Sequence, residues 1–190
     1  MKSIITIGLL LIFGKFSQSQ NVFSNQTNVA LEKVIQDYPN KFKNIKGALI
    51  INNPQATDYA SNITIPGSLS CIVTEYSSTK KDVVSWRAEL FETEEFDEAK
   101  KQYKDVFNQI KNTIVKIDGE KSYILNGQFQ NPEEKKRYHS TFFTLIPSNS
   151  QLQKIKVELV LQYQLPFWKI SLTIYDRDRE DNEKGSASER

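Results

Sequence analysis

Residues 93–117 read TEEFDEAKKQYKDVFNQIKNTIVKI. Apolar side chains recur here at steps of three and four residues, the spacing of one helix face, and they are Phe96, Ala99, Tyr103, Val106, Ile110, Ile114 and Ile117. Thr93 stands where an N-cap is expected, and the acidic residues after it suit the positive end of a helix dipole. The stretch predicts a helix from Glu94 to about Lys116, ended by Asp118-Gly119.

On both sides of this helix the apolar period changes to two, which is typical of strands with one buried face. Before the helix, residues 68–76 and 84–90 alternate in this way and predict a hairpin across the turn at 77–82. After it, residues 123–129, 140–146, 155–163 and 168–174 predict four more strands. Short turns join these four, so we expect an antiparallel meander.

Residues 27–38 predict a second helix, because one helical face carries Leu31, Val34, Ile35 and Tyr38, and Pro39 follows. Residues 46–51 predict one further strand. The predicted class is therefore α+β: a twisted antiparallel sheet, with about four C-terminal and two to four N-terminal strands, packed against one long helix and one short N-terminal helix. This order also suggests two α-β4 halves, although their sequences show little similarity.

The first nineteen residues resemble a secretory signal peptide. Lys2 precedes an apolar run over residues 4–13, and Ser17 and Ser19 have the spacing of a small-x-small cleavage site. The run is shorter than the roughly 20 residues needed to cross a bilayer. We therefore expect residues 1–19 to be cleaved, with no stable membrane insertion afterwards; the alternative is a buried N-terminal helix. The expected location is the periplasm or the secreted fraction.

Two further segments follow from composition. Residues 20–175 are expected to form a single domain. Residues 176–190 contain no large apolar side chain and are expected to form a disordered charged tail.

The chain has 25 Lys and Arg against 23 Asp and Glu, and removal of residues 1–19 takes away Lys2 and Lys15. A mature chain with no net charge is a poor match for nucleic acid, which requires a concentrated basic surface.

The sequence contains no convincing catalytic, cofactor-binding or metal-binding motif. His139 is the single histidine, so a site with several histidine ligands is impossible, and its position suggests the start of a strand. Cys71 is the single cysteine and shares strand parity with Leu69 and Val73, which favours a small buried hydrophobe over a reactive thiol. We predict no catalytic residue, no cofactor and no metal.

Aromatic residues make up 11% of the chain, and most fall on apolar parities. Six are assigned instead to the opposite parity or to strand ends and form a candidate binding surface: Tyr76, Phe91, Tyr138, Phe143, Phe167 and Tyr175. The first hypothesis is an exported, non-enzymatic module that binds a protein or envelope component through the sheet. A carrier of a small apolar ligand and a hydrolase that uses carboxylates alone are the alternatives.

Overall fold

The structure is a computed structural model of the 190-residue chain, and it describes residues 20–77, 83–117, 122–147, 152 and 154–176. The predicted signal peptide, the charged tail beyond Asp176 and the turns at 78–82 and 118–121 lie outside the described residues. The elements, in chain order, are α1 (Gln20–Asp37), a 3₁₀ turn (Tyr38–Asn40), β1 (Lys46–Asn52), β2 (Ala56–Ser61), β3 (Ser70–Tyr76), β4 (Val83–Thr93), α2 (Phe96–Ile110), β5 (Ile114–Val115), β6 (Tyr123–Gly127), β7 (Tyr138–Ile146), β8 (Ile155–Gln164) and β9 (Phe167–Asp176).

All strands of the described residues join one antiparallel sheet in the order β1-β2-β3-β4-β9-β8-β7-β6-β5. This order is symmetric about the central pair β4 and β9, which run antiparallel. On each side lies a meander of four strands preceded in the chain by a helix, with the two-residue β5 added at one edge. The predicted α+β class with an antiparallel sheet is confirmed, whereas the predicted strand counts are matched only in part, because β5 adds a fifth strand after α2.

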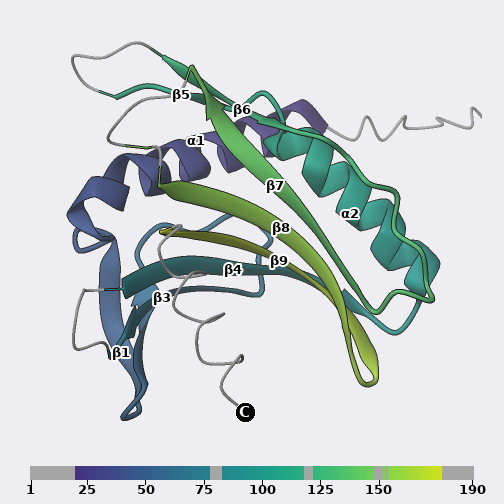
Figure 1. Cartoon of the computed structure of the whole chain (residues 1–190), viewed down its shortest axis with the longest axis horizontal. Coiled ribbons are helices and arrows are strands. Elements are labelled where there is room, and N and C mark those ends of the chain that lie inside the picture. The colour runs from purple at the N-terminus through teal and green to yellow at the C-terminus, as the bar shows by residue number, and fades with distance from the viewer. Residues whose placement is uncertain (1–19, 78–82, 118–121, 148–151, 153, 177–190) are drawn as a thin grey trace, which may run out of the picture.

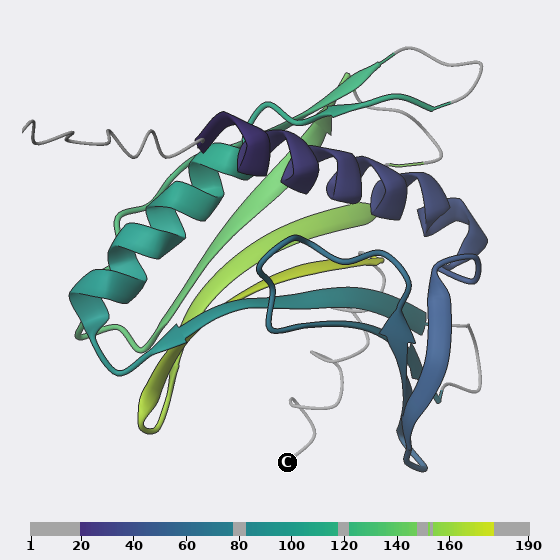
Figure 2. The same ribbon diagram turned by 180° about the vertical axis from the view of Figure 1, so that it is seen from behind.

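Both helices lie on one face of the sheet (Figures 1 and 2), and α2 packs on β4, β8 and β9 while α1 packs on β5 and α2. In Figure 2 the helices stand in front of the strands, and Figure 1 views the opposite face. We call that opposite face the helix-free face. Neither helix of the described residues has the length and apolar composition that crossing a bilayer requires.

The predicted helix lengths are wrong. With 18 residues α1 is longer than α2, which has 15 and ends at Ile110 instead of continuing to Lys116. Asn112 adopts a left-handed φ of 70°, and its N–H donates to the Leu125 carbonyl at 2.8 Å. The β-branched residues that follow then pair with β6 as strand β5. At the other end the N-cap is Glu95, and Thr93 is the last residue of β4.

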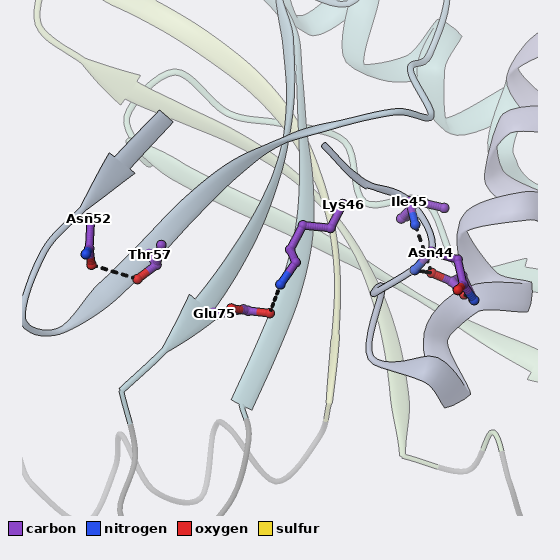
Figure 3. Close-up of polar contacts among 7 residues, drawn as sticks. Asn44, Ile45, Lys46, Asn52, Thr57 and Glu75 are labelled. Carbon is purple, nitrogen blue, oxygen red and sulfur yellow. Dashed lines mark hydrogen bonds and ion pairs between the residues drawn. The ribbon is translucent and has the colours of Figure 1, made fainter. Parts of the chain in front are cut away.

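A buried aspartate fixes the turn between α1 and β1. The Asp37 carboxylate accepts hydrogen bonds from the backbone nitrogens of Asn44 (3.0 Å) and Ile45 (3.3 Å) and from Nδ2 of Asn44 (2.6 Å). Figure 3 shows Asn44 and Ile45 beside the end of α1, and Lys46 reaching toward Glu75. Because these bonds satisfy backbone groups beyond the helix end, they hold β1 in a defined direction relative to α1.

The core lies between the helices and the sheet. The predicted stripe of α2 is buried at Ala99, Tyr103, Val106 and Ile110, and Cys71 is buried as expected. Tyr103 also carries a polar atom into the core, where its hydroxyl donates to Thr141 Oγ1 at 2.9 Å and lies 3.2 Å from the Leu159 carbonyl oxygen. These bonds join α2 to β7 and β8.

The ionisation of Tyr103 makes the free energy of unfolding depend on pH in the alkaline range. Burial raises the pKa of its hydroxyl to about 12, from an ordinary value of 10.0. The unfolded chain therefore loses this proton at lower pH than the folded chain does. We expect the free energy of unfolding to fall by roughly 2–3 kcal/mol as the pH rises from 10 to 12. Urea unfolding across this range measures the decline, which should be smaller in Tyr103→Phe; identical pH profiles for the two proteins would contradict this assignment.

Candidate binding surface

Large apolar side chains adjoin one another on the helix-free face at the outer strands. Ile114, Ile124 and Ile146 are direct cross-strand neighbours on β5, β6 and β7. Phe142 and Tyr138 lie on the same face of β7 as Ile146, separated from it and from each other by Thr144 and Ser140, because alternate residues of a strand share a face. We call these five residues the outer patch; their exposed fractions are 52%, 43% and 49% for the isoleucines, 45% for Phe142 and 55% for Tyr138.

Four of the six predicted surface residues belong to the helix-free face. Tyr138 lies in the outer patch, whereas Tyr175 is largely buried farther along the same face on β9. Phe167 is half-buried where β9 leaves the β8–β9 turn, on the strand parity of Tyr175. Tyr76 ends β3, and its hydroxyl lies 3.3 Å from Ser85 Oγ. Ser85 is the cross-strand partner of Tyr175, and Glu158 bonds both Tyr175 and Tyr138, so the structure links three of these four residues and leaves Phe167 apart.

The other two predicted residues point to the helix side. Phe143 is buried against Phe107 of α2, with ring centroids 5.4 Å apart. It is an odd number of residues from Tyr138, so the two cannot share a face of a regular strand; Phe142 occupies the exposed position instead. Phe91 follows a β-bulge in β4 and aligns with Ile170, so it packs against the core.

No motif in the sequence pointed to Glu158, a carboxylate on the helix-free face. Glu158 of β8 accepts one hydrogen bond from the Tyr138 hydroxyl through Oε1 and one from the Tyr175 hydroxyl through Oε2, each at 3.0 Å. Partial burial and the negative charge of Glu158 raise the pKa of Tyr138 to about 12. The Tyr138 hydroxyl is a donor in this bond, which restrains the ring.

Lys156 supports the neighbouring aromatic rings. Its ammonium lies 5.1 Å from the ring centroid of Phe142 and 6.0 Å from that of Tyr175, within the range of cation–π attraction. Phe142 is thereby held on the side that faces β8. The aromatic residues of the face are thus positioned by Glu158 and Lys156 from one strand, which makes this part of the surface preorganised.

A cavity of about 360 Å³ opens beside Phe142, on the side away from β8. It is lined by residues of β6, β7 and the segment that follows β6: Asn126, Gly127, Gln128, Gln130, Ser140, Thr141, Phe142 and Thr144. Gly127 is required by close packing, because a Cβ atom at this position would lie 2.7 Å from Cδ1 of Phe143 and 3.0 Å from the Phe142 carbonyl oxygen. The lining contains no charged side chain.

A second cavity, also of about 360 Å³, lies at the opposite end of the sheet between the α1–β1 turn and the ends of β3 and β4. Lys41 and Lys43 line it together with Glu75 and Tyr76. Lys46, which lies outside this lining, forms an ion pair with Glu75 at 2.6 Å. The single carboxylate of this lining is therefore already paired with a lysine from outside it.

The residues considered for chemistry lie apart from both cavities. Nε2 of His139 lies 3.2 Å from the backbone nitrogen and 2.9 Å from the carbonyl oxygen of Glu133, so it holds the segment that leads into β7. Cys71 Sγ lies 3.3 Å from Ser68 Oγ. Across the described ranges, no three His, Cys, Asp or Glu side chains are grouped so that they could hold a metal ion.

Comparison with known protein families, characterised proteins and solved structures finds no match to this chain.

Proposed function

We propose that the protein is an exported, non-enzymatic binding module whose outer patch contacts a protein or another envelope component. The observation that supports this most is the row of Ile114, Ile124 and Ile146 across three strands, with Phe142 and Tyr138 also exposed on the same face of β7, on a sheet face that no helix of the described residues covers. Contiguous exposed apolar groups of this kind mark interaction sites more often than scattered ones do. The signal-like residues 1–19 support export to the periplasm or beyond.

The composition of the patch suits a binding role. Its aromatic members bury large areas at small entropic cost, and aromatic residues are enriched in the centres of interfaces. The bond from Tyr138 to Glu158 restrains one of these rings before a partner arrives. Each apolar side chain that a partner covers contributes about 25 cal/mol per Å² of buried apolar area, before the cost of association.

The interior supports a binding module over a carrier of an apolar ligand. Between α2 and the sheet, Phe129 lies 5.1 Å from Phe107 and 6.0 Å from Tyr103, measured between ring centroids, and Phe107 also packs on Phe143. These rings pack against one another beneath α2, where a carrier would need space for its ligand. Glu158, the carboxylate at the centre of the helix-free face, is occupied by two tyrosine hydroxyls, which favours a structural role over hydrolysis.

Recovery of the mature protein from the envelope fraction of its own host, followed by native mass spectrometry, tests the proposal. We expect the wild-type protein to retain a stoichiometric partner, and Ile124→Asp to reduce this recovery at least tenfold, because about 1.4 kcal/mol of lost affinity is sufficient for that change. Ile124 is exposed, so the substitution should leave the fold intact.

Leu165→Asp is the matched control. Leu165 is an apolar residue that is 84% exposed in the turn between β8 and β9, outside the outer patch. The Leu165→Asp variant should retain the partner at the wild-type level. Equal recovery with Ile124→Asp and wild type, or equal loss with both variants, would contradict the proposed role of the patch.

A further inference from the structure

The cavity beside Phe142 exists because β6 is shorter than β7. The two strands pair only from Ile124↔Ile146 to Gly127↔Phe143, after which residues 128–130 leave the sheet. No strand of the described residues pairs with the outer edge of β7 from Tyr138 to Phe142. This leaves a recess with backbone groups at its base and side chains from both segments around it.

The lining offers neutral hydrogen-bonding groups. Asn126, Gln128 and Gln130 each present an amide with two donor hydrogens and an acceptor oxygen. Within the described part of the chain, none of these three amides forms a side-chain hydrogen bond. The hydroxyls of Ser140 and Thr144 lie in the same lining. The recess therefore combines donors and acceptors, which is the pattern that a ligand with several hydroxyl groups requires.

Phe142 supplies the apolar wall. Its ring lines the cavity, and the Lys156 ammonium lies 5.1 Å from the ring centroid. An aromatic ring beside neutral amides can stack on the C–H face of a sugar ring while the amides bind its hydroxyls. The volume of about 360 Å³ lies at the small end of the usual range for ligand sites, which suits a short part of a chain rather than a folded partner.

Charge and polarity disfavour charged ligands and purely apolar ones. An anionic or cationic ligand would lose hydration without gaining an opposite charge, since the lining of the cavity is uncharged. A purely apolar ligand would leave the amide groups without partners. We propose that this cavity is a binding subsite for an uncharged glycan, with Phe142 as the stacking platform and Asn126, Gln128 and Gln130 as the groups that bind hydroxyls.

This inference rests on the proposed binding function and names a ligand class for the same face. The test is an NMR titration of the ¹⁵N-labelled mature protein with neutral oligomers of β-1,4-glucose, α-1,4-glucose, β-1,4-mannose and β-1,4-N-acetylglucosamine. An oligomer of α-1,4-galacturonate is the charged comparison. We expect at least one neutral oligomer to shift the side-chain amide signals of Asn126, Gln128 and Gln130 saturably, and the charged oligomer to leave them unchanged.

Three variants locate the binding. Phe142→Ala should raise Kd at least tenfold, and Gln128→Ala about threefold to tenfold, as expected for the loss of a stacking platform and of one or two hydrogen bonds. Gln164→Ala is the matched control, because Gln164 is an exposed glutamine at the end of β8, outside the cavity. Its Kd should stay within about twofold of wild type. Gln128 is also exposed, so its variant tests the site even where Phe142→Ala fails to fold.

Two results overturn the glycan site: no saturable shift with any neutral oligomer, or a Kd that neither Phe142→Ala nor Gln128→Ala changes. Its failure is distinguishable from failure of the proposed function. If the outer patch retains a partner that Ile124→Asp loses while every oligomer fails to bind, only the glycan inference is wrong. If the oligomers bind at the cavity while Ile124→Asp retains the partner, the role of the outer patch is wrong.

Discussion

Ile110→Asp is expected to unfold the protein at room temperature. Ile110 is the last residue of α2, and its side chain is fully buried. Removing a buried isoleucine costs about 2–5 kcal/mol, and a carboxylate left there without a partner costs several kcal/mol more. The sum is comparable with the whole stability of an ordinary domain, about 5–15 kcal/mol. Loss of the cooperative thermal transition, followed by circular dichroism, is the measurement.

Two variants make this prediction specific to the position. Asn108→Asp places the same charge on the exposed side of α2 and should change the free energy of unfolding by less than about 0.5 kcal/mol. Ile114→Asp separates the predicted helix from the observed one. In a helix that continued to Lys116, Ile114 would lie on the buried stripe, but in the structure it is half-exposed on β5. A stable Ile114→Asp is expected, and unfolding of this variant would contradict the end of α2 at Ile110.

Trp86→Ala should lower the free energy of unfolding by about 3–5 kcal/mol. Trp86 is fully buried on β4, one of the two central strands, and is the largest of the fully buried side chains. Its indole nitrogen donates a hydrogen bond of 2.9 Å to Ser61 Oγ on β2. Alanine removes both the packing and the link between these strands. Urea unfolding of both proteins, with m compared to detect changes in the denatured state, measures the loss.

Trp86→Phe separates packing from the hydrogen bond. It keeps an aromatic ring but removes the N–H, so we expect a smaller loss of about 1–2 kcal/mol. Ser61 Oγ retains its own bond to the Ile63 carbonyl at 2.7 Å, which limits the effect on the acceptor. Equal losses for Trp86→Ala and Trp86→Phe would contradict the view that packing of this side chain dominates.

Phe142 connects the two proposals. It belongs to the outer patch and also lines the cavity, and the Lys156 ammonium lies 5.1 Å from its ring centroid. A glycan in the cavity and a larger partner on the patch would therefore share one aromatic residue. We expect binding at the two places to be coupled through Phe142, whereas Ile114 and Leu165 lie outside the cavity lining.

The local periodicity of apolar residues predicted much of the fold. The alternation at Val84, Trp86 and Ala88 correctly predicted a strand with a buried face, and the stripe at Ala99, Tyr103, Val106 and Ile110 correctly predicted the packed side of α2. Both patterns are short-range consequences of burying one side of a regular element. They required no knowledge of which strands are neighbours.

The sequence by itself determined the α+β class with its antiparallel sheet, and the apolar positions of β4 up to Ala88 and of α2 up to Ile110 that are buried. Only the tertiary structure decided where α2 stops, because the Asn112 turn depends on a hydrogen bond to Leu125 of β6. It also decided that the bulge turns Phe91 toward the core and that Tyr138 and Tyr175 meet at Glu158. These outcomes depend on strand register and on contacts between distant residues, and a repeat of two or of three to four residues carries no information about either.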